Sequence, residues 1–97
     1  MTIIQTACRE ISGFETFYLK FLRRMSINDR ADSTCKSYGR SLAAIALYFN
    51  RIPTQLNQEE VEDYLYFTKQ KFGSGSDNYF KFAICALRFV FRMEGMD

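Results

Sequence analysis

Apolar residues recur at the three- and four-residue spacing of an α-helix in four stretches of the chain, and no stretch alternates convincingly as a strand does. The stretches cover about residues 13–26, Ser33 to the residues before Pro53, Asn57 to a break at 73–76, and about 76–94. The break, Gly-Ser-Gly-Ser, is the strongest turn signal in the chain. We therefore predict one all-α domain over residues 1–97, a bundle of four helices whose ordered part covers about 12–94.

Three sequence signals indicate where these helices begin. Ser12 with Glu15, and Asn57 with Glu60, have the spacing of a capping box, in which each side chain accepts a hydrogen bond from a backbone N–H at the helix start. Ser33 is expected to cap the second helix, because a serine hydroxyl can accept from an unpaired amide of the first turn.

The apolar stripes predict the core. Apolar residues make up 47% of the chain, with ten Phe and six Tyr, which is enough to fill the interior of one domain. The predicted core residues are Phe14, Phe17, Tyr18, Phe21, Leu22 and Met25 in the first helix and Tyr38, Leu42, Ile45, Ala46 and Phe49 in the second. The fourth helix is apolar around most of its circumference, which predicts a central position. Gly39 costs a helix about 1 kcal/mol relative to alanine, which indicates either close packing or a bend.

The residue types present exclude several kinds of site. The chain has no His, which removes histidine-based acid–base chemistry and histidine metal ligands. Cys8, Cys35 and Cys85 are far apart and lack the spacing of a zinc site, so we expect reduced thiols. The acidic run at 59–63 suits the positive end of a helix dipole. We therefore expect no metal, no cofactor, no small-molecule substrate and no catalytic residue.

Neither a membrane span nor a secretory signal is expected. The longest apolar run, about residues 82–91, is interrupted by Arg88 and is shorter than the roughly 20 residues that a span needs. Residues 1–8 lack the basic leader and the long apolar stretch of a signal peptide. We expect a cytoplasmic protein.

The net charge of +2 conceals an uneven distribution. Outside the acidic run at 59–63, the chain has 13 basic residues against 7 acidic ones, a surplus of six. Basic residues alternate with small polar ones on one face of the second helix, at Lys36, Ser37 and Arg40, and along a strip of the fourth. The strip consists of Asn78, Lys81, Cys85, Arg88 and Arg92. Such faces suit a phosphate backbone, although from the spacing alone a solvated face that keeps the bundle soluble is the commoner explanation.

Several short motifs follow one another in a defined order. Residues 33–38, followed by Leu42, have the form T-x-x-x-Y, and residues 53–65 read P-T-Q-L-N-Q-E-E-V-E-D-Y-L. The short polar turn at 73–76 comes next, and residues 86–92 read A-L-R-F-V-F-R. In this order the motifs resemble the N-terminal core-binding domain, also called the SAM-like domain, of tyrosine recombinases (phage integrases). The similarity covers about residues 14–95.

The resemblance implies a four-helix SAM-like module that clamps one side of duplex DNA during integration or recombination of a mobile element. In that family the second and fourth helices face the major groove. The DNA-binding residues implied are Thr34, Lys36, Ser37, Arg40, Lys81 and Arg88, and we add Ser33 from the same motif and Asn78 from the strip. Tyr79 and Phe82 stand where the family often has Thr and Arg.

The resemblance also assigns the chemistry to another part of the protein. The catalytic Arg, His and Tyr of the family belong to a separate C-terminal domain that is absent from this chain. We therefore expect no enzymatic activity from the chain alone, and other recombinase protomers as partners in the full-length protein. The alternative is a helical protein-interaction module without DNA binding, in which exposed aromatic residues such as Tyr48, Tyr66 or Phe82 anchor a partner.

Overall fold

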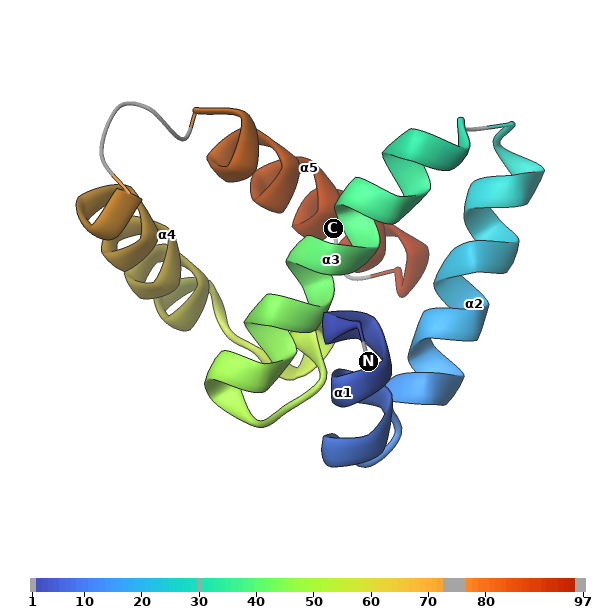
Figure 1. Cartoon of the computed structure of the whole chain (residues 1–97), viewed down its shortest axis with the longest axis horizontal. Coiled ribbons are helices and arrows are strands. Elements are labelled where there is room, and N and C mark those ends of the chain that lie inside the picture. Colours follow the sequence, from blue (N-terminus) through green and yellow to red (C-terminus); the bar gives the residue numbers. More distant parts are fainter. Residues whose placement is uncertain (1, 30, 73–76, 96–97) are drawn as a thin grey trace.

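The computed structural model describes residues 2–29, 31–72 and 77–95, and in this part every regular element is helical (Figure 1). The elements are α1 (Ile3–Glu10), α2 (Phe14–Ile27), α3 (Asp32–Phe49), the short 3₁₀ helix η1 (Pro53–Gln55), α4 (Gln58–Phe72) and α5 (Asp77–Met93). The predicted all-α class is confirmed, and α2 to α5 are the four predicted helices. None of the helices described has the length and apolar character that a membrane span requires.

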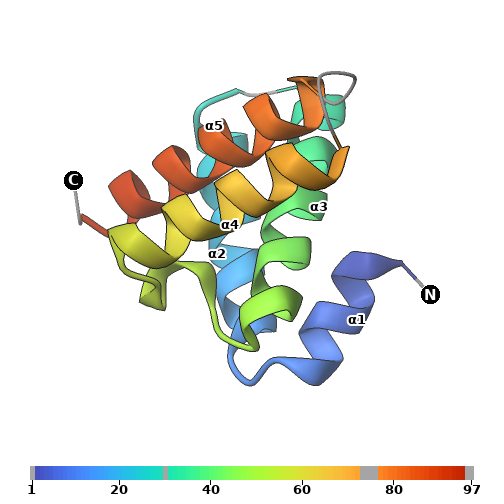
Figure 2. The same ribbon diagram turned by 90° about the vertical axis from the view of Figure 1, so that its left-hand side faces the viewer.

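Helices α3 and α5 cross at the centre of the bundle. In Figure 1, α1 and α2 lie on one side of α3, and α4 lies on the other. Figure 2 shows α4 and α5 side by side and running in opposite directions. Helix α5 packs against α2, α3, α4 and η1, which agrees with the central position predicted from its apolar circumference.

Helix α1 is a fifth α-helix that the sequence pattern did not predict, so the ordered part begins well before residue 12. It starts with a capping box: Gln5 N donates to Thr2 Oγ1 at 3.1 Å, and Thr2 N donates to Gln5 Oε1 at 2.9 Å. Ala7 and Ile11, four residues apart, bury against the rest of the bundle. The T-x-x-Q spacing was the available signal, but an eight-residue helix shows too few turns for its periodicity to stand out.

Two of the three predicted caps are wrong. Helix α2 follows Gly13, which has a φ of 84° and no side-chain cap, so the Ser12–Glu15 capping box does not form. Helix α3 follows Ala31, again without a side-chain cap, which places Ser33 inside the first turn. The third cap is confirmed, since Glu60 N donates to Asn57 Oδ1 at 2.8 Å and Asn57 N donates to Glu60 Oε1 at 3.0 Å.

The observed caps give a test with internal controls. We expect Asn57→Ala to lower the free energy of unfolding by about 1 kcal/mol, because an amide of the first turn of α4 loses its acceptor. Ser12→Ala and Ser33→Ala should each change it by less than about 0.5 kcal/mol, since neither hydroxyl caps a helix. Urea denaturation followed by circular dichroism measures all three. An equal loss for Ser33→Ala would contradict the observed start of α3.

The core follows the predicted stripes. Phe14, Phe21 and Met25 of α2 and Leu42 of α3 have no exposed surface, and Val90 of α5 is equally buried. The ring of Phe21 lies edge-on to Phe89 of α5, with ring centroids 5.7 Å apart. Apolar burial therefore ties α2 to the central pair of helices.

Gly39 allows close packing, one of the two explanations that the sequence left open. A Cβ atom at this position would lie 3.0 Å from Tyr18 Cε1, 3.1 Å from the Tyr18 hydroxyl and 3.3 Å from Ile4 Cδ1. The Tyr18 ring is stacked on Phe14 and on Phe21, at centroid distances of 6.1 and 5.9 Å. The ring therefore has little freedom to move away from a larger residue at position 39.

We expect Gly39→Ala to destabilise the fold by about 1 kcal/mol, because the crowding of Tyr18 outweighs the better helix propensity of alanine. In a Tyr18→Leu background the same change should be neutral or stabilising, since the clash is removed. A double-mutant cycle by urea denaturation measures this coupling. Stabilisation by Gly39→Ala in the wild-type background would show that the ring yields.

Candidate nucleic-acid interface

The basic face of α3 points away from α5. Tyr38 contacts Phe82 of α5, with ring centroids 6.1 Å apart. Lys36 and Arg40 each lie two residues from Tyr38, about 200° around the helix, so they project from the opposite side. Both side chains are exposed.

The small polar candidates of α3 divide between two faces. Ser33 and Ser37 share the face of Lys36 and Arg40, because neighbours within this set are three or four residues apart. Ser33 is exposed and Ser37 is half-buried. Thr34 lies one turn before Tyr38 and is half-buried on the side that turns toward α5. The structure therefore groups four of the five α3 candidates and separates Thr34.

The basic strip of α5 lies on its outer surface. Lys81 and Arg88, seven residues apart, lie on one face about two turns from each other, and both are exposed. On one flank of this face Phe89 contacts Phe21 of α2, and on the other flank Phe91 faces α4. Asn78, the remaining candidate, is outside the side chains that the structure describes.

The candidate residues thus occupy two separate faces. One is the outer side of α3 and the other is the outer side of α5 between its two packed flanks. A ligand that contacts both has to follow the surface across the α3–α5 crossing. Which residues share a helix face could be inferred from spacing, but this relation between the two faces depends on how the helices cross.

The four cations of these faces are not neutralised within the described part of the chain. Lys36, Arg40, Lys81 and Arg88 form no salt bridge with a described residue, whereas other basic residues do. The pairs are Arg9–Glu10 at 3.6 Å, Lys20–Glu94 at 3.2 Å, and Arg51–Glu60. The two candidate faces therefore keep their positive charge for an external anion.

The acidic run has a structural role at Glu60. Its carboxylate accepts hydrogen bonds from the Arg51 guanidinium and from the backbone N–H of Asn57, and the Arg51 bond is the larger cause of its lowered pKa. The Gln58 side chain donates to Glu62 at 3.3 Å. These contacts organise the start of α4, in keeping with the structural explanation of the run.

The lowered pKa of Glu60 predicts a pH dependence of stability. A carboxyl group whose pKa falls below its ordinary value of 4.5 on folding stabilises the fold while ionised. This contribution is complete above that value and disappears as the pH falls through the lowered pKa. We expect Glu60→Gln to flatten the decline in unfolding free energy below about pH 4.5, with Glu59→Gln as the control. Chemical denaturation at several pH values measures it, and parallel curves for wild type and Glu60→Gln would contradict it.

Partial burial raises the pKa of two further groups, one in α1 and one in α2. The Cys8 thiol and the Tyr18 hydroxyl both have a raised pKa, mainly through desolvation. Both groups therefore stay protonated near neutral pH.

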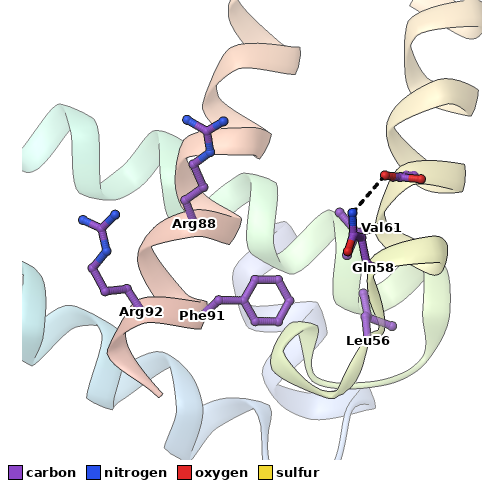
Figure 3. A pocket seen from close by; sticks show the side chains of 7 residues that line it. Leu56, Gln58, Val61, Arg88, Phe91 and Arg92 are labelled. Carbon is purple, nitrogen blue, oxygen red and sulfur yellow. Dashed lines mark hydrogen bonds between the residues drawn. The ribbon is translucent and has the colours of Figure 1, made fainter. Parts of the chain in front are cut away.

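A groove that the sequence pattern did not predict lies between α4 and α5. Figure 3 shows Arg88 and Arg92 projecting in one direction from α5, and the Phe91 ring turned toward Leu56 and Val61. Arg92 belongs to the basic strip recognised from the sequence, but it is not among the predicted DNA-binding residues. The groove itself depends on packing between residues about thirty positions apart, which no local pattern indicates.

Comparison of the chain with protein-family models, with curated proteins and with solved structures finds no match. The similarity to recombinase core-binding domains therefore rests on the motifs and on their order. In the structure three of these motifs lie in the first turns of α3, from η1 into α4, and in the second half of α5, and the turn at 73–76 lies outside the described residues.

Proposed function

We propose that this domain binds duplex DNA through the outer faces of α3 and α5. The observation that carries the proposal is the set of four exposed cations, Lys36, Arg40, Lys81 and Arg88, none of which is paired with a described acidic residue. Cations of this kind displace the counterions of a phosphate backbone, and the release of those counterions favours binding.

Small polar groups next to the cations support the same proposal. Ser33 and Ser37 lie beside Lys36 and Arg40, and hydroxyl groups donate hydrogen bonds to phosphate oxygens. An exposed helix face such as that of α3 also has the dimensions to enter a major groove, where Arg and Lys can contact guanine edges.

The biological role that we propose follows the resemblance to tyrosine recombinases. The domain would hold one side of a recombination site while a catalytic domain on a longer chain acts on the DNA, together with other protomers. The chain alone would not cleave DNA. The cytoplasmic location expected from the sequence belongs to the same proposal.

The experiment is a salt titration of binding to a fluorescent duplex, followed by anisotropy. Four phosphate contacts predict that the logarithm of the association constant falls with the logarithm of salt concentration with a slope of about −3.6, which is four times −0.9. Binding that does not change with salt, or no binding at low salt, would refute the proposal.

A protein-interaction module remains the second candidate because of its exposed aromatic side chains. Tyr48 is 54% exposed, Tyr66 69% and Phe82 37%. The ring centroids of Tyr48 and of Phe67 in α4 are 5.6 Å apart, and Phe67 is 44% exposed, so the two rings form a small apolar surface. Salt-insensitive self-association without DNA binding would favour this candidate.

A further inference from the structure

The groove between α4 and α5 combines an apolar floor with charged walls. Its volume is about 540 Å³, within the usual range for sites that accept a ligand or an anchoring side chain. Its lining residues are Leu56, Gln58, Val61, Glu62, Arg88, Phe91 and Arg92.

The floor is formed by Leu56, Val61 and Phe91. Leu56 is 4% exposed, and Val61 and Phe91 are half-buried, so a partner that fills the groove covers apolar surface that water now reaches. A phosphate backbone gains nothing from such a floor. The carboxylate of Glu62 on the α4 wall would also repel it.

The two walls differ in charge. Arg88 and Arg92 stand one turn apart on the α5 wall and project in the same direction (Figure 3). The α4 wall has the Glu62 carboxylate, which accepts a hydrogen bond from Gln58, and no basic residue. Acidic groups of a ligand are therefore expected on the α5 side.

We propose that the α4–α5 groove binds an amphipathic helix of a partner protein, with an apolar stripe on the floor and acidic residues against Arg88, which is exposed and forms no salt bridge with a described residue. Helices α4 and α5 run antiparallel (Figure 2), and a groove between two such helices can accept a third helix by ridge-into-groove packing. Apolar residues at positions i, i+4 and i+7 of the partner reach Leu56, Val61 and Phe91, and its glutamates face α5.

The groove shares Arg88 with the proposed DNA-binding face of α5 but contains no residue of the α3 face. Lys36 and Arg40 do not line the groove, so their replacement by alanine leaves it intact. Loss of DNA binding and loss of helix binding can therefore be distinguished in one set of variants.

The test uses two synthetic helical peptides with leucines at i, i+4 and i+7. One has glutamates along one flank, and the other has lysines at the same positions. We expect the glutamate peptide to bind about tenfold more tightly than the lysine peptide in fluorescence anisotropy. Arg88→Glu should weaken it about tenfold, whereas Lys81→Glu, an equal charge change on the same helix but outside the groove, should have little effect.

Several results would overturn the proposal. These are no binding of the glutamate peptide at about 1 mM, equal binding of both peptides, or equal effects of Arg88→Glu and Lys81→Glu. Self-association of the chain that Arg88→Glu abolishes would identify a second copy as the occupant instead. Sedimentation velocity over a range of protein concentrations measures that outcome.

Discussion

Replacing Phe21 with alanine is expected to lower the free energy of unfolding by about 3–5 kcal/mol. The Phe21 side chain has no exposed surface, and its ring contacts Tyr18 in its own helix and Phe89 in α5. The substitution leaves a cavity where α2 meets α5, and the surrounding helices can collapse into it only in part.

The size of this loss is decisive because a domain of this length has a total stability of about 5–15 kcal/mol. Leu19→Ala is the control, since Leu19 belongs to the same helix but is 60% exposed, and it should change the stability by less than about 0.5 kcal/mol. Urea denaturation of both variants measures the difference. A loss below about 1 kcal/mol for Phe21→Ala would contradict the packing of α2 described above.

The second large effect concerns binding. We expect the double variant Lys36→Ala, Arg40→Ala to bind duplex DNA at least about tenfold more weakly at 0.1 M salt, and to reduce the salt slope by about 1.8. Each lost phosphate contact removes about 0.9 from that slope. Because both side chains are exposed, the fold should stay intact, which thermal denaturation can verify.

A matched control separates local contacts from total charge. Lys69→Ala with Lys71→Ala removes two positive charges from the last turn of α4, where neither residue belongs to a candidate face. This variant should keep most of the affinity and of the salt slope. If the two double variants lose affinity equally, binding depends on overall charge and the assignment of α3 is wrong.

The predictability of the fold followed the length of each periodic pattern. Helices α2 to α5 contain three or more turns, so their apolar residues repeat often enough to be recognised, and residues such as Phe14, Leu42 and Ile45 are buried as expected. Helix α1 has eight residues, and its cap signal at Thr2 and Gln5 was overlooked. The predicted caps at Ser12 and Ser33 are wrong although serine is a common cap residue, because the helices begin after other residues. Gly13, in a left-handed conformation, precedes α2, and Ala31, in an extended one, precedes α3.

The candidate site was predictable only within each helix. Spacing placed Lys36 with Arg40, and Lys81 with Arg88, because side chains three, four or seven residues apart share a face. The relation between the two faces depends on how α3 packs against α5, which includes the contact of Tyr38 with Phe82, 44 positions apart in the chain. The groove likewise requires Val61 and Phe91 to come together, and only the tertiary structure brings this about.

The most direct measurement is an NMR titration of the isotope-labelled domain with an unlabelled duplex, following the backbone amide shifts. DNA binding through α3 and α5 predicts salt-sensitive shifts concentrated in residues 32–40 of α3 and 81–92 of α5, with little change in α1 and along α4. Shifts confined to the surface around Tyr48 and Phe67, or no shifts at low salt, would contradict DNA binding through α3 and α5.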